Sequence, residues 1–310
     1  MADPIAGVAR NGPHAPSTTP RPSHLSAIDA VGRPPGYDPP VVPEATEAAI
    51  TSSAPRRSRI FELPIDLGHP DELLARIIGW VGDGGPTKRV MYVNAHVLNQ
   101  SREDPALRAA LEQADLVYCD GYGVRLAAKA LSTEIPHRMT GADWIWDLAA
   151  LCEAQDTSVY LLGCDPGVAA QAGQRLRRAH PGLRVVGTHH GYFEIGSGHD
   201  ERVIEDVNAC KPDILLVGMG TPKQEIWAQR TVDRLDCSVL WGVGALFDFV
   251  SGRVPRAPAS LSDNGLEWIF RLAIEPQRMW KRYLVGNPVF LSRVLAQARQ
   301  RHARQRHDPG

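Results

Sequence analysis

Short apolar runs rich in β-forming residues alternate with amphipathic stretches of helical length from Ile60 to about Pro255. The runs with strand character are Val90–Asn94, Leu116–Cys119, Ser158–Gly163, Arg184–Thr188, Asp213–Gly218 and Ser238–Val243. The helical patterns between them are Pro105–Gln113, Gly141–Ala154, Gly167–Ala179, Asp200–Cys210 and Pro222–Leu235. Strands joined by crossover helices pair in parallel, and the helices then cover both faces of the sheet. The sequence therefore predicts an α/β fold with a mostly parallel, Rossmann-like sheet, whose ligands bind beyond the carboxyl ends of the strands.

The two ends of the chain differ in composition from this α/β region. Residues 1–58 hold 11 of the 25 prolines and few large apolar side chains, which predicts a disordered tail. From Glu267 to Arg306 there are nine Lys or Arg and two acids, although the whole chain has a net charge of -1. We therefore predict a Pro-rich tail (1–58), an α/β domain (59–255) and a basic amphipathic helical appendage (256–310).

Composition excludes several classes of protein. A net charge of -1 argues against a globally basic nucleic-acid binder. The five cysteines include no CxxC pair, so neither a disulfide framework nor a thiolate zinc site is indicated, and a reducing cytosol fits best. No run reaches the roughly 18 apolar residues of a membrane span. We expect a cytoplasmic protein that, if it meets a membrane, lies on its surface.

The strand Asp213–Gly218 runs through two glycines directly into a helix. Thr221 fits the N-cap and Gln224 the third helical position, which predicts a capping box. The glycines permit close backbone approach, and the free amides of a helix start suit a phosphate. The substrate-binding residues on this interpretation are Gly218, Gly220, Lys223 and Gln224. In the alternative interpretation Gln224 only completes the capping box and does not contact a ligand.

Polar residues also follow two other predicted strands. Asp120 directly follows Leu116–Cys119, where its carboxylate would project into the cleft of an open sheet, although Asp-Gly is also a common turn. Asn94 ends a second strand. His96, His189 and His190 match no zinc spacing and are interpreted as polar loop residues. The chain has no Asp-x-Asp dyad to clamp a metal on a diphosphate, and we predict neither a metal nor another cofactor.

Eight segments, taken together, resemble the WecG/TagA/CpsF glycosyltransferases, also classed as glycosyltransferase family 26. They are NAHVLNQSREDPALRAAL, ADLVYCDGYGVRLAAK, RMTGADW, VYLLGCDPGVA, HPGLRVVGTHHGYF, KPDILLVGMGTPKQEIW, GVGALFDFVSGRVPRAP and GLEWIFRLAIEPQRMWKRY. The resemblance implies inverting, metal-independent transfer of a sugar from a UDP-sugar to an undecaprenyl-diphosphate-linked acceptor. The sugar would be of the N-acetylmannosamine type, a hexose or a uronic acid. The setting would be cell-surface polysaccharide synthesis at the cytoplasmic membrane face.

The resemblance also implies roles for single residues. Asp120 matches the family's catalytic base, Arg138 the arginine of R-x-T-G, and Gln224 the glutamine of P-K-Q-E. Asn94 matches the strand-end asparagine, and Tyr92 stands where relatives often have threonine. We expect Tyr92, Asn94 and Asp120 to form the catalytic centre. Such a transfer needs a base near the acceptor hydroxyl and positive charge near the departing diphosphate.

For two of the expected substrate-binding residues, the sequence also allows a purely structural role. Without the resemblance, Arg138 is as well explained by a surface ion pair. Asp248 lies in GALFDF and could face the cleft, or could be a helix-cap or loop residue.

Aromatic and basic residues interleave in the appendage. The apolar members are Trp268, Ile269, Leu272, Trp280, Tyr283 and Leu284, and the basic ones are Arg271, Arg278, Lys281 and Arg282. This pattern predicts a helical segment in a lipid interface, although the aromatics could instead pack on the α/β body. The resemblance implies that the segment docks on the membrane and brings Arg271, Arg278 and Arg282 over the site, where they would hold the diphosphate. A homo-oligomer formed through the sheet domain is compatible with it.

Two other functions compete with transfer. A non-catalytic nucleotide-sugar-binding subunit of a polysaccharide assembly complex would bind a donor without moving its sugar, and it has no need of a placed base. An NAD-dependent oxidoreductase has the right sheet class, but the chain lacks G-x-G-x-x-G in a first βαβ unit.

Overall fold

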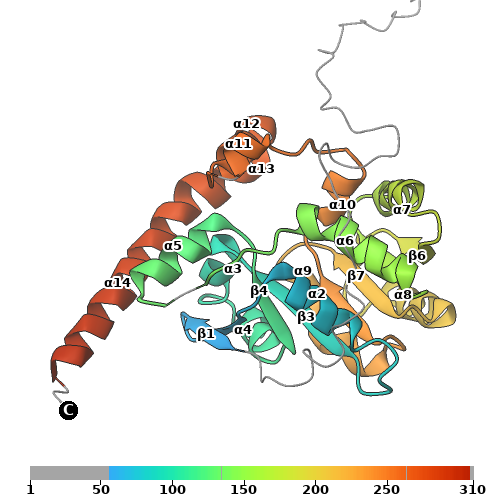
Figure 1. The fold of residues 1–310 in the computed structure, drawn as a ribbon, viewed down its shortest axis with the longest axis horizontal. Coiled ribbons are helices and arrows are strands. Elements are labelled where there is room, and N and C mark those ends of the chain that lie inside the picture. Colours follow the sequence, from blue (N-terminus) through green and yellow to red (C-terminus); the bar gives the residue numbers. More distant parts are fainter. Residues whose placement is uncertain (1–55, 134, 263, 308–310) are drawn as a thin grey trace, which may run out of the picture.

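The computed structural model describes residues 56–133, 135–262 and 264–307, so nearly all of the predicted tail lies outside the described residues. Its centre is a six-stranded sheet with the order β4-β3-β8-β7-β5-β6, in which every neighbouring pair is parallel (Figure 1). The strands are β3 (Lys88–Val93), β4 (Leu116–Cys119), β5 (Ser158–Gly163), β6 (Arg184–His189), β7 (Ile214–Gly218) and β8 (Val239–Gly242). All six predicted strands are present, and the predicted parallel α/β fold is confirmed.

Each face of the sheet is covered by its own set of helices, because successive side chains of a strand point to opposite faces. In β7, Leu215 and Val217 join one core, whereas Ile214 and Leu216 join the other. The first core includes α3 (Ala95–Gln100), α4 (Pro105–Glu112), α5 (Tyr122–Ala130), α8 (Gly198–Cys210) and α9 (Lys223–Thr231). The second includes α2 (Pro70–Ile78), α6 (Gly141–Ala154), α7 (Val168–Ala179) and α10 (Leu246–Val250).

A short antiparallel hairpin, β1 (Arg57–Ile60) and β2 (Leu63–Asp66), precedes the sheet and was not among the predicted strands. Ile60 is buried in the first core. The Asp66 carboxylate accepts a hydrogen bond of 2.9 Å from the Val117 amide of β4. The first strand, RSRI, has a single apolar residue and so no run to recognise in the sequence, and contacts with β4 fix this hairpin.

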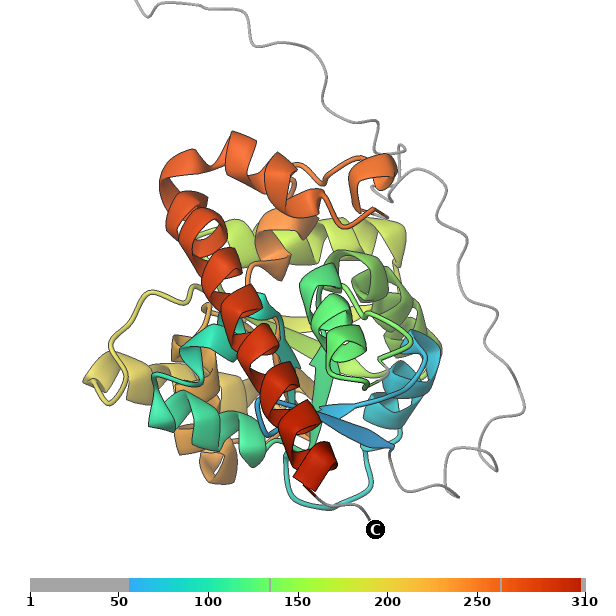
Figure 2. The ribbon, with the colours of Figure 1, turned by 90° about the vertical axis from the view of Figure 1, so that its left-hand side faces the viewer.

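The C-terminal segment forms helices that return over the body. They are α11 (Ala259–Ser262), α12 (Glu267–Ile274), α13 (Pro276–Trp280), the π-helical turn η2 (Lys281–Val285) and α14 (Gly286–His307). α14 crosses the side of the molecule (Figure 2), where Phe290 and Val294 are buried in the first core. The Asn99 side chain of α3 donates a hydrogen bond of 2.8 Å to the carbonyl of Gly286. Within the described residues, no helix has the length and apolar character that a membrane crossing requires.

Candidate active site

A cavity of about 580 Å³ lies where β3, β4 and β8 end, between the sheet and the C-terminal helices. Its lining includes six of the predicted site residues, namely Tyr92, Asn94, Asp120, Arg138, Arg271 and Arg282. The other predicted binding residues lie outside this lining and are Gly218, Gly220, Lys223, Gln224, Asp248 and Arg278. The fold thus brings the strand-end polar groups together with two arginines of the C-terminal segment.

The turn after β4 presents Asp120 to the cavity. The Asp120 amide donates to the carbonyl of Val93 (2.9 Å), and Gly121 has φ of 116°, a conformation that favours glycine. Asp120 and Gly121 therefore form a tight turn, as one of the two interpretations of the sequence predicted. The same turn places the Asp120 carboxylate in the cavity lining.

Asn94 both caps a helix and contacts Asp120. Its Oδ1 accepts hydrogen bonds from the amides of His96 (3.0 Å) and Val97 (3.1 Å), which makes it the N-cap of α3. Because Oδ1 is taken, the hydrogen bond between the two side chains runs from Nδ2 of Asn94 to the Asp120 carboxylate. His96, predicted as a loop residue, lies instead in the first turn of α3.

The surroundings raise the pKa of Asp120 to about 6. Burial is the largest cause and the Glu267 carboxylate the next, whereas Arg282, the Asn94 hydrogen bond and Arg138 oppose the rise. A carboxylate with such a pKa is still mainly ionised at pH 7 and is a stronger base than an exposed aspartate. Burial and the charge of Arg282 lower the pKa of His96 to about 4, so this imidazole is neutral there.

Two arginines reach the cavity from the C-terminal helices. Arg271 is buried, forms an ion pair of 2.9 Å with Glu275, and its guanidinium lies 4.7 Å from the ring centroid of Phe249. The Nε atoms of Arg271 and Arg282 are buried and have no hydrogen-bond acceptor among the described residues. Buried donors of this kind ordinarily have a partner, and guanidinium groups bind phosphate oxygens well. These two positions are therefore suited to an anionic ligand.

Several cavity residues were not predicted from the sequence. The charge of Glu267 is second only to burial in raising the pKa of Asp120, and Tyr122 and Leu126 of α5 present partly exposed apolar surface to the cavity. Trp268 stacks obliquely on Tyr283 with 6.0 Å between ring centroids. Glu267 and Asp120 lie far apart in the sequence, so no local pattern could have joined them.

Tyr92 connects the cavity with the β7–α9 turn. Its hydroxyl packs against Gly244, which has φ of 59°, and hydrogen-bonds the Thr221 side chain. Burial raises the pKa of this phenol to about 12, so the phenol stays protonated at neutral pH. A side chain on Gly244 would overlap the Tyr92 hydroxyl.

The predicted capping box at α9 is wrong. The N-cap is Pro222, and no side chain within the described residues caps this helix. Instead, Thr221 Oγ1 (2.8 Å) and Gln224 Nε2 (2.9 Å) both donate to Oε1 of the buried Glu225, whose pKa is raised by burial. Gln224, fully buried, accepts a hydrogen bond of 2.9 Å from the Gly244 amide through Oε1. The glutamine therefore joins α9 to the loop after β8.

We expect Gln224→Ala to lower the free energy of unfolding by about 2 kcal/mol, because it leaves the buried Gly244 amide without a partner. Urea denaturation monitored by tryptophan fluorescence measures this change. Gln171→Ala, at an exposed position of α7, is the matched control and should change stability by less than about 0.5 kcal/mol. Equal stability of the two variants would contradict the role assigned to Gln224.

Asp248 and Arg278 belong to an ionic group that lies outside the cavity lining and is linked to Arg271 through Glu275. Asp248, buried in α10, lies 3.7 Å from Arg253 and 3.9 Å from Arg278. Arg278 also pairs with Glu275 at 3.0 Å, and Arg253 pairs with Asp165, which follows β5. Asp248 is thus an internal helix residue with charged partners rather than a cap or loop residue.

The fold and the cavity together define a class of protein. A carboxyl with a raised pKa, two arginine guanidinium groups and a parallel sheet with its cavity at the carboxyl ends of the strands are typical of α/β enzymes that transfer groups from phosphate-activated donors. The chain belongs to the glycosyl transferase WecG/TagA/CpsF family, whose family model it matches over residues 58–304. The resemblance seen in the sequence is confirmed, and the protein is a glycosyltransferase.

Named relatives come from Staphylococcus aureus. The N-acetylglucosaminyldiphosphoundecaprenol N-acetyl-beta-D-mannosaminyltransferase of strain NCTC 8325 is 29% identical over 213 residues, which are 68% of this chain and 81% of the relative. The protein of the same name from strain COL has the same identity and coverage. The one from strain MW2 is 28% identical over the same length.

Proposed function

We propose that this protein transfers a sugar of the N-acetylmannosamine type from a UDP-sugar to an undecaprenyl-diphosphate-linked N-acetylglucosamine. A hexose or a uronic acid is the alternative donor sugar. The names of the relatives support the acceptor and the sugar. The observation that carries the proposal is the cavity itself, in which a carboxylate with a pKa of about 6 faces arginines with unpartnered Nε atoms.

The proposed chemistry is a single displacement without a metal. Asp120 accepts the proton of the acceptor hydroxyl while that oxygen forms a bond to the anomeric carbon of the donor sugar. The bond from that carbon to the diphosphate oxygen breaks on the opposite face, so the configuration inverts. UDP leaves with the electron pair of this bond, and Arg271 and Arg282, with Arg138, stabilise its charge.

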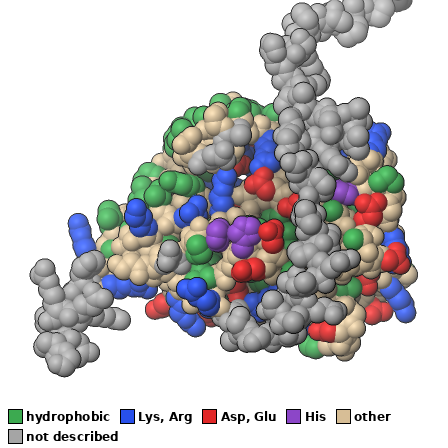
Figure 3. All heavy atoms as spheres, in the orientation of Figure 1, with side chains coloured by type: hydrophobic (Ala, Val, Ile, Leu, Met, Phe, Trp, Pro, Cys, Tyr) green, Lys and Arg blue, Asp and Glu red, His purple; other side chains and the backbone are tan. Residues whose placement is uncertain are grey.

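Apolar surface at the C-terminal helices supports a lipid-linked acceptor. Figure 3 shows apolar side chains gathered over the helices at the top of the molecule. The exposed members of the C-terminal segment are Leu266, Ile269, Ile274, Trp280, Leu284, Val285, Leu291 and Leu295. Leu284 and Leu291 also line the cavity. With the basic residues of the same segment, this surface suits an anionic leaflet, and we propose a peripheral position on the cytoplasmic membrane face.

We expect the double variant Leu284→Ser/Leu291→Ser to bind anionic liposomes at least about tenfold more weakly, because two exposed leucines lose their contact with the acyl region. Sedimentation with and without liposomes measures the binding and also shows whether the protein forms the homo-oligomer that the family resemblance allows. Tyr192→Ser, at an exposed apolar residue on the loop between β6 and α8, is the matched control. Unchanged binding of the double variant would contradict membrane docking through this surface.

A donor screen tests the proposed function. The protein is incubated with a short-chain polyprenyl-diphosphate N-acetylglucosamine, several UDP-sugars and EDTA, and both UDP and extended lipid are followed. Release of UDP matched by product with an N-acetylmannosamine donor is the expected result. Donor binding without product on any acceptor would favour the non-catalytic binding subunit, and a requirement for added Mg²⁺ would overturn the metal-independent step.

The rate of transfer should rise with pH along a limb with an apparent pKa of about 6, because Asp120 acts as a base only when ionised. Glu267→Gln removes the like charge that raises this pKa, so the limb should move to lower pH. The pH profile of kcat/KM measures the shift. Glu205→Gln, exposed on α8, should leave the profile in place. A limb that does not respond to Glu267→Gln would mean that another group titrates.

A further inference from the structure

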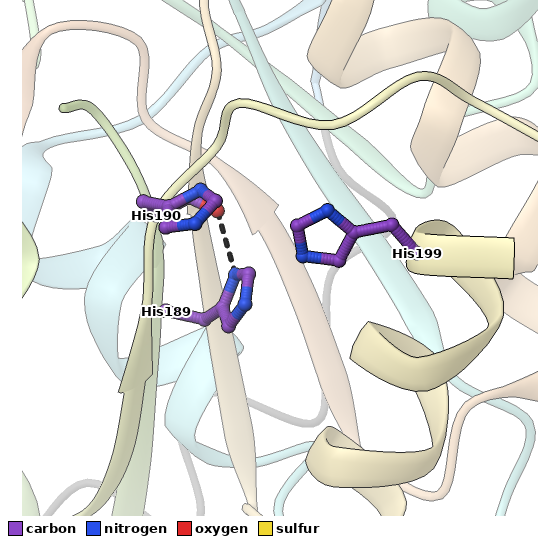
Figure 4. A group of neighbouring side chains, drawn as sticks. All are labelled: His189, His190 and His199. Carbon is purple, nitrogen blue, oxygen red and sulfur yellow. Dashed lines mark hydrogen bonds between the residues drawn. The ribbon is translucent and has the colours of Figure 1, made fainter. Parts of the chain in front are cut away.

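Three histidines meet at the edge of the sheet opposite Asp120. His189 is the last residue of β6, His190 follows it, and His199 lies in the first turn of α8. One ring nitrogen from each side chain lies within 4.8 Å of the other two. Figure 4 shows the rings of His189 and His190 at the end of the strand and that of His199 facing them from the helix. The sequence pattern grouped the first two with His96, but the fold joins them to His199.

The backbone fixes the tautomer of His189. Its Nδ1 lies 2.7 Å from the carbonyl oxygen of His190. A carbonyl only accepts, so Nδ1 carries the proton and Nε2 keeps its lone pair. A carbonyl that holds the second nitrogen of a ring is the usual support of a metal-binding histidine, because it orients the ring and raises its basicity.

His190 is held more loosely. Its Nδ1 accepts a hydrogen bond of 3.2 Å from the amide of Tyr192. Binding of a cation through Nε2 moves the ring proton to Nδ1 and gives up this long bond.

Among the described residues, these three histidines alone make up the group that could hold a metal ion. Both carboxylate oxygens of Asp200, the residue after His199, already accept hydrogen bonds. Oδ1 accepts one from Trp227 Nε1 (2.7 Å), and Oδ2 accepts one from the Gly196 amide (2.7 Å). The Asp200 carboxylate partly balances the charge of the nearby Lys223 ammonium. Three imidazoles and a water suit zinc and similar first-row ions, whereas Mg²⁺ and Ca²⁺ require oxygen ligands.

We propose that His189, His190 and His199 bind one transition-metal ion of the zinc class, which ties the end of β6 to the start of α8. Nitrogens around a tetrahedral zinc ion lie about 3.4 Å apart, so the rings close by roughly 1 Å through side-chain rotation. The ion would close the loop 190–197, whose Gly191 and Phe193 carbonyls accept hydrogen bonds from Lys223 Nζ. β6 and β4 are opposite edges of the sheet, so this ion is structural and takes no part at Asp120.

Metal titration of the full chain, with any affinity tag removed, tests the proposal. Competition between the protein and a chromophoric chelator for Zn²⁺ should show one tight site per chain, and Mg²⁺ should not compete. His199→Gln removes one ligand and should weaken this site at least about tenfold, since loss of a supporting contact alone costs about 10- to 100-fold. His190→Gln is a second variant with the same expected loss. The unfolding temperature of the wild type should rise with Zn²⁺ more than that of either variant.

His137→Gln is the matched control. His137 is exposed, and its ring lies 4.8 Å from that of His69 between centroids, so these two form a close histidine pair that has no third histidine among the described residues. Its Zn²⁺ affinity should equal that of the wild type. Equal affinities of His199→Gln, His190→Gln and the wild type would overturn the proposal, and so would a loss of the tight site in His137→Gln. These measurements do not depend on sugar transfer, so they are independent of the proposed function.

Discussion

Asp120→Asn is expected to lower kcat for sugar transfer by about 10³-fold, because the amide cannot accept the proton of the acceptor hydroxyl. Affinity for the UDP-sugar should change by less than about threefold, since asparagine keeps the size of the side chain and its place beside Asn94. Steady-state turnover and equilibrium binding of the donor measure the two quantities separately. Turnover within about threefold of the wild type would remove Asp120 from the role of base.

The same substitution should make the protein more stable. The pKa of Asp120 is about 6 in the folded protein against an ordinary 3.8, so its ionisation opposes folding. The full shift corresponds to roughly 3 kcal/mol. Screening by solvent at this partly exposed side chain reduces the expected gain of Asp120→Asn to about 1–2 kcal/mol.

Because the pKa of Asp120 is higher in the folded than in the unfolded state, the gain in stability of Asp120→Asn depends on pH. Above pH 6 the folded wild type carries the unfavourable charge, so the variant has its full advantage. As the pH falls from about 6 to 3.8 the carboxyl becomes protonated in both states, and the difference disappears. Urea denaturation at pH 8 and pH 4 measures it. Asp206→Asn, exposed on α8, is the control and should show no gain at either pH. A destabilised Asp120→Asn at pH 8 would show that the carboxylate serves structure rather than chemistry.

Arg282→Met is the second substitution with a large expected effect. It removes a donor from the cavity and should lower kcat/KM by about 10²- to 10³-fold, the usual effect of losing one group that stabilises charge in a transition state. Arg282 also lowers the pKa of Asp120, so the acidic limb of the pH profile should move to higher pH in the variant. A shift in that direction would not follow from a merely local loss of packing.

Lys281→Met is the matched control for Arg282→Met. Lys281 is the preceding residue of η2, it is exposed, and its ammonium lies 5.6 Å from the ring centroid of Trp280. The two variants lose the same charge and share the same new side chain, so any common effect on membrane attraction cancels. Equal losses of kcat/KM in the two variants would show that Arg282 acts only through the membrane.

The strands and most of the helices could be predicted from the sequence because their signals are local. The predicted Gly141–Ala154 coincides with α6, and each predicted strand lies within one or two residues of the observed one. The position of Asp120 followed from the same pattern, since the carboxyl ends of parallel strands meet at one edge of the sheet. The alternation of apolar residues encodes these features within a few positions of each residue.

Only the tertiary structure decided which side chains meet. Gln224 has the spacing of a capping residue, yet the buried Glu225 beside it takes the hydrogen bonds of both Gln224 and Thr221. Glu267 acts on Asp120 because the C-terminal helices return over β4, and His199 joins His189 because α8 folds back on β6. Local periodicity determined the elements of this protein. Long-range packing determined the partners of its charged and polar groups, because contacts between residues distant in the sequence leave no periodic pattern.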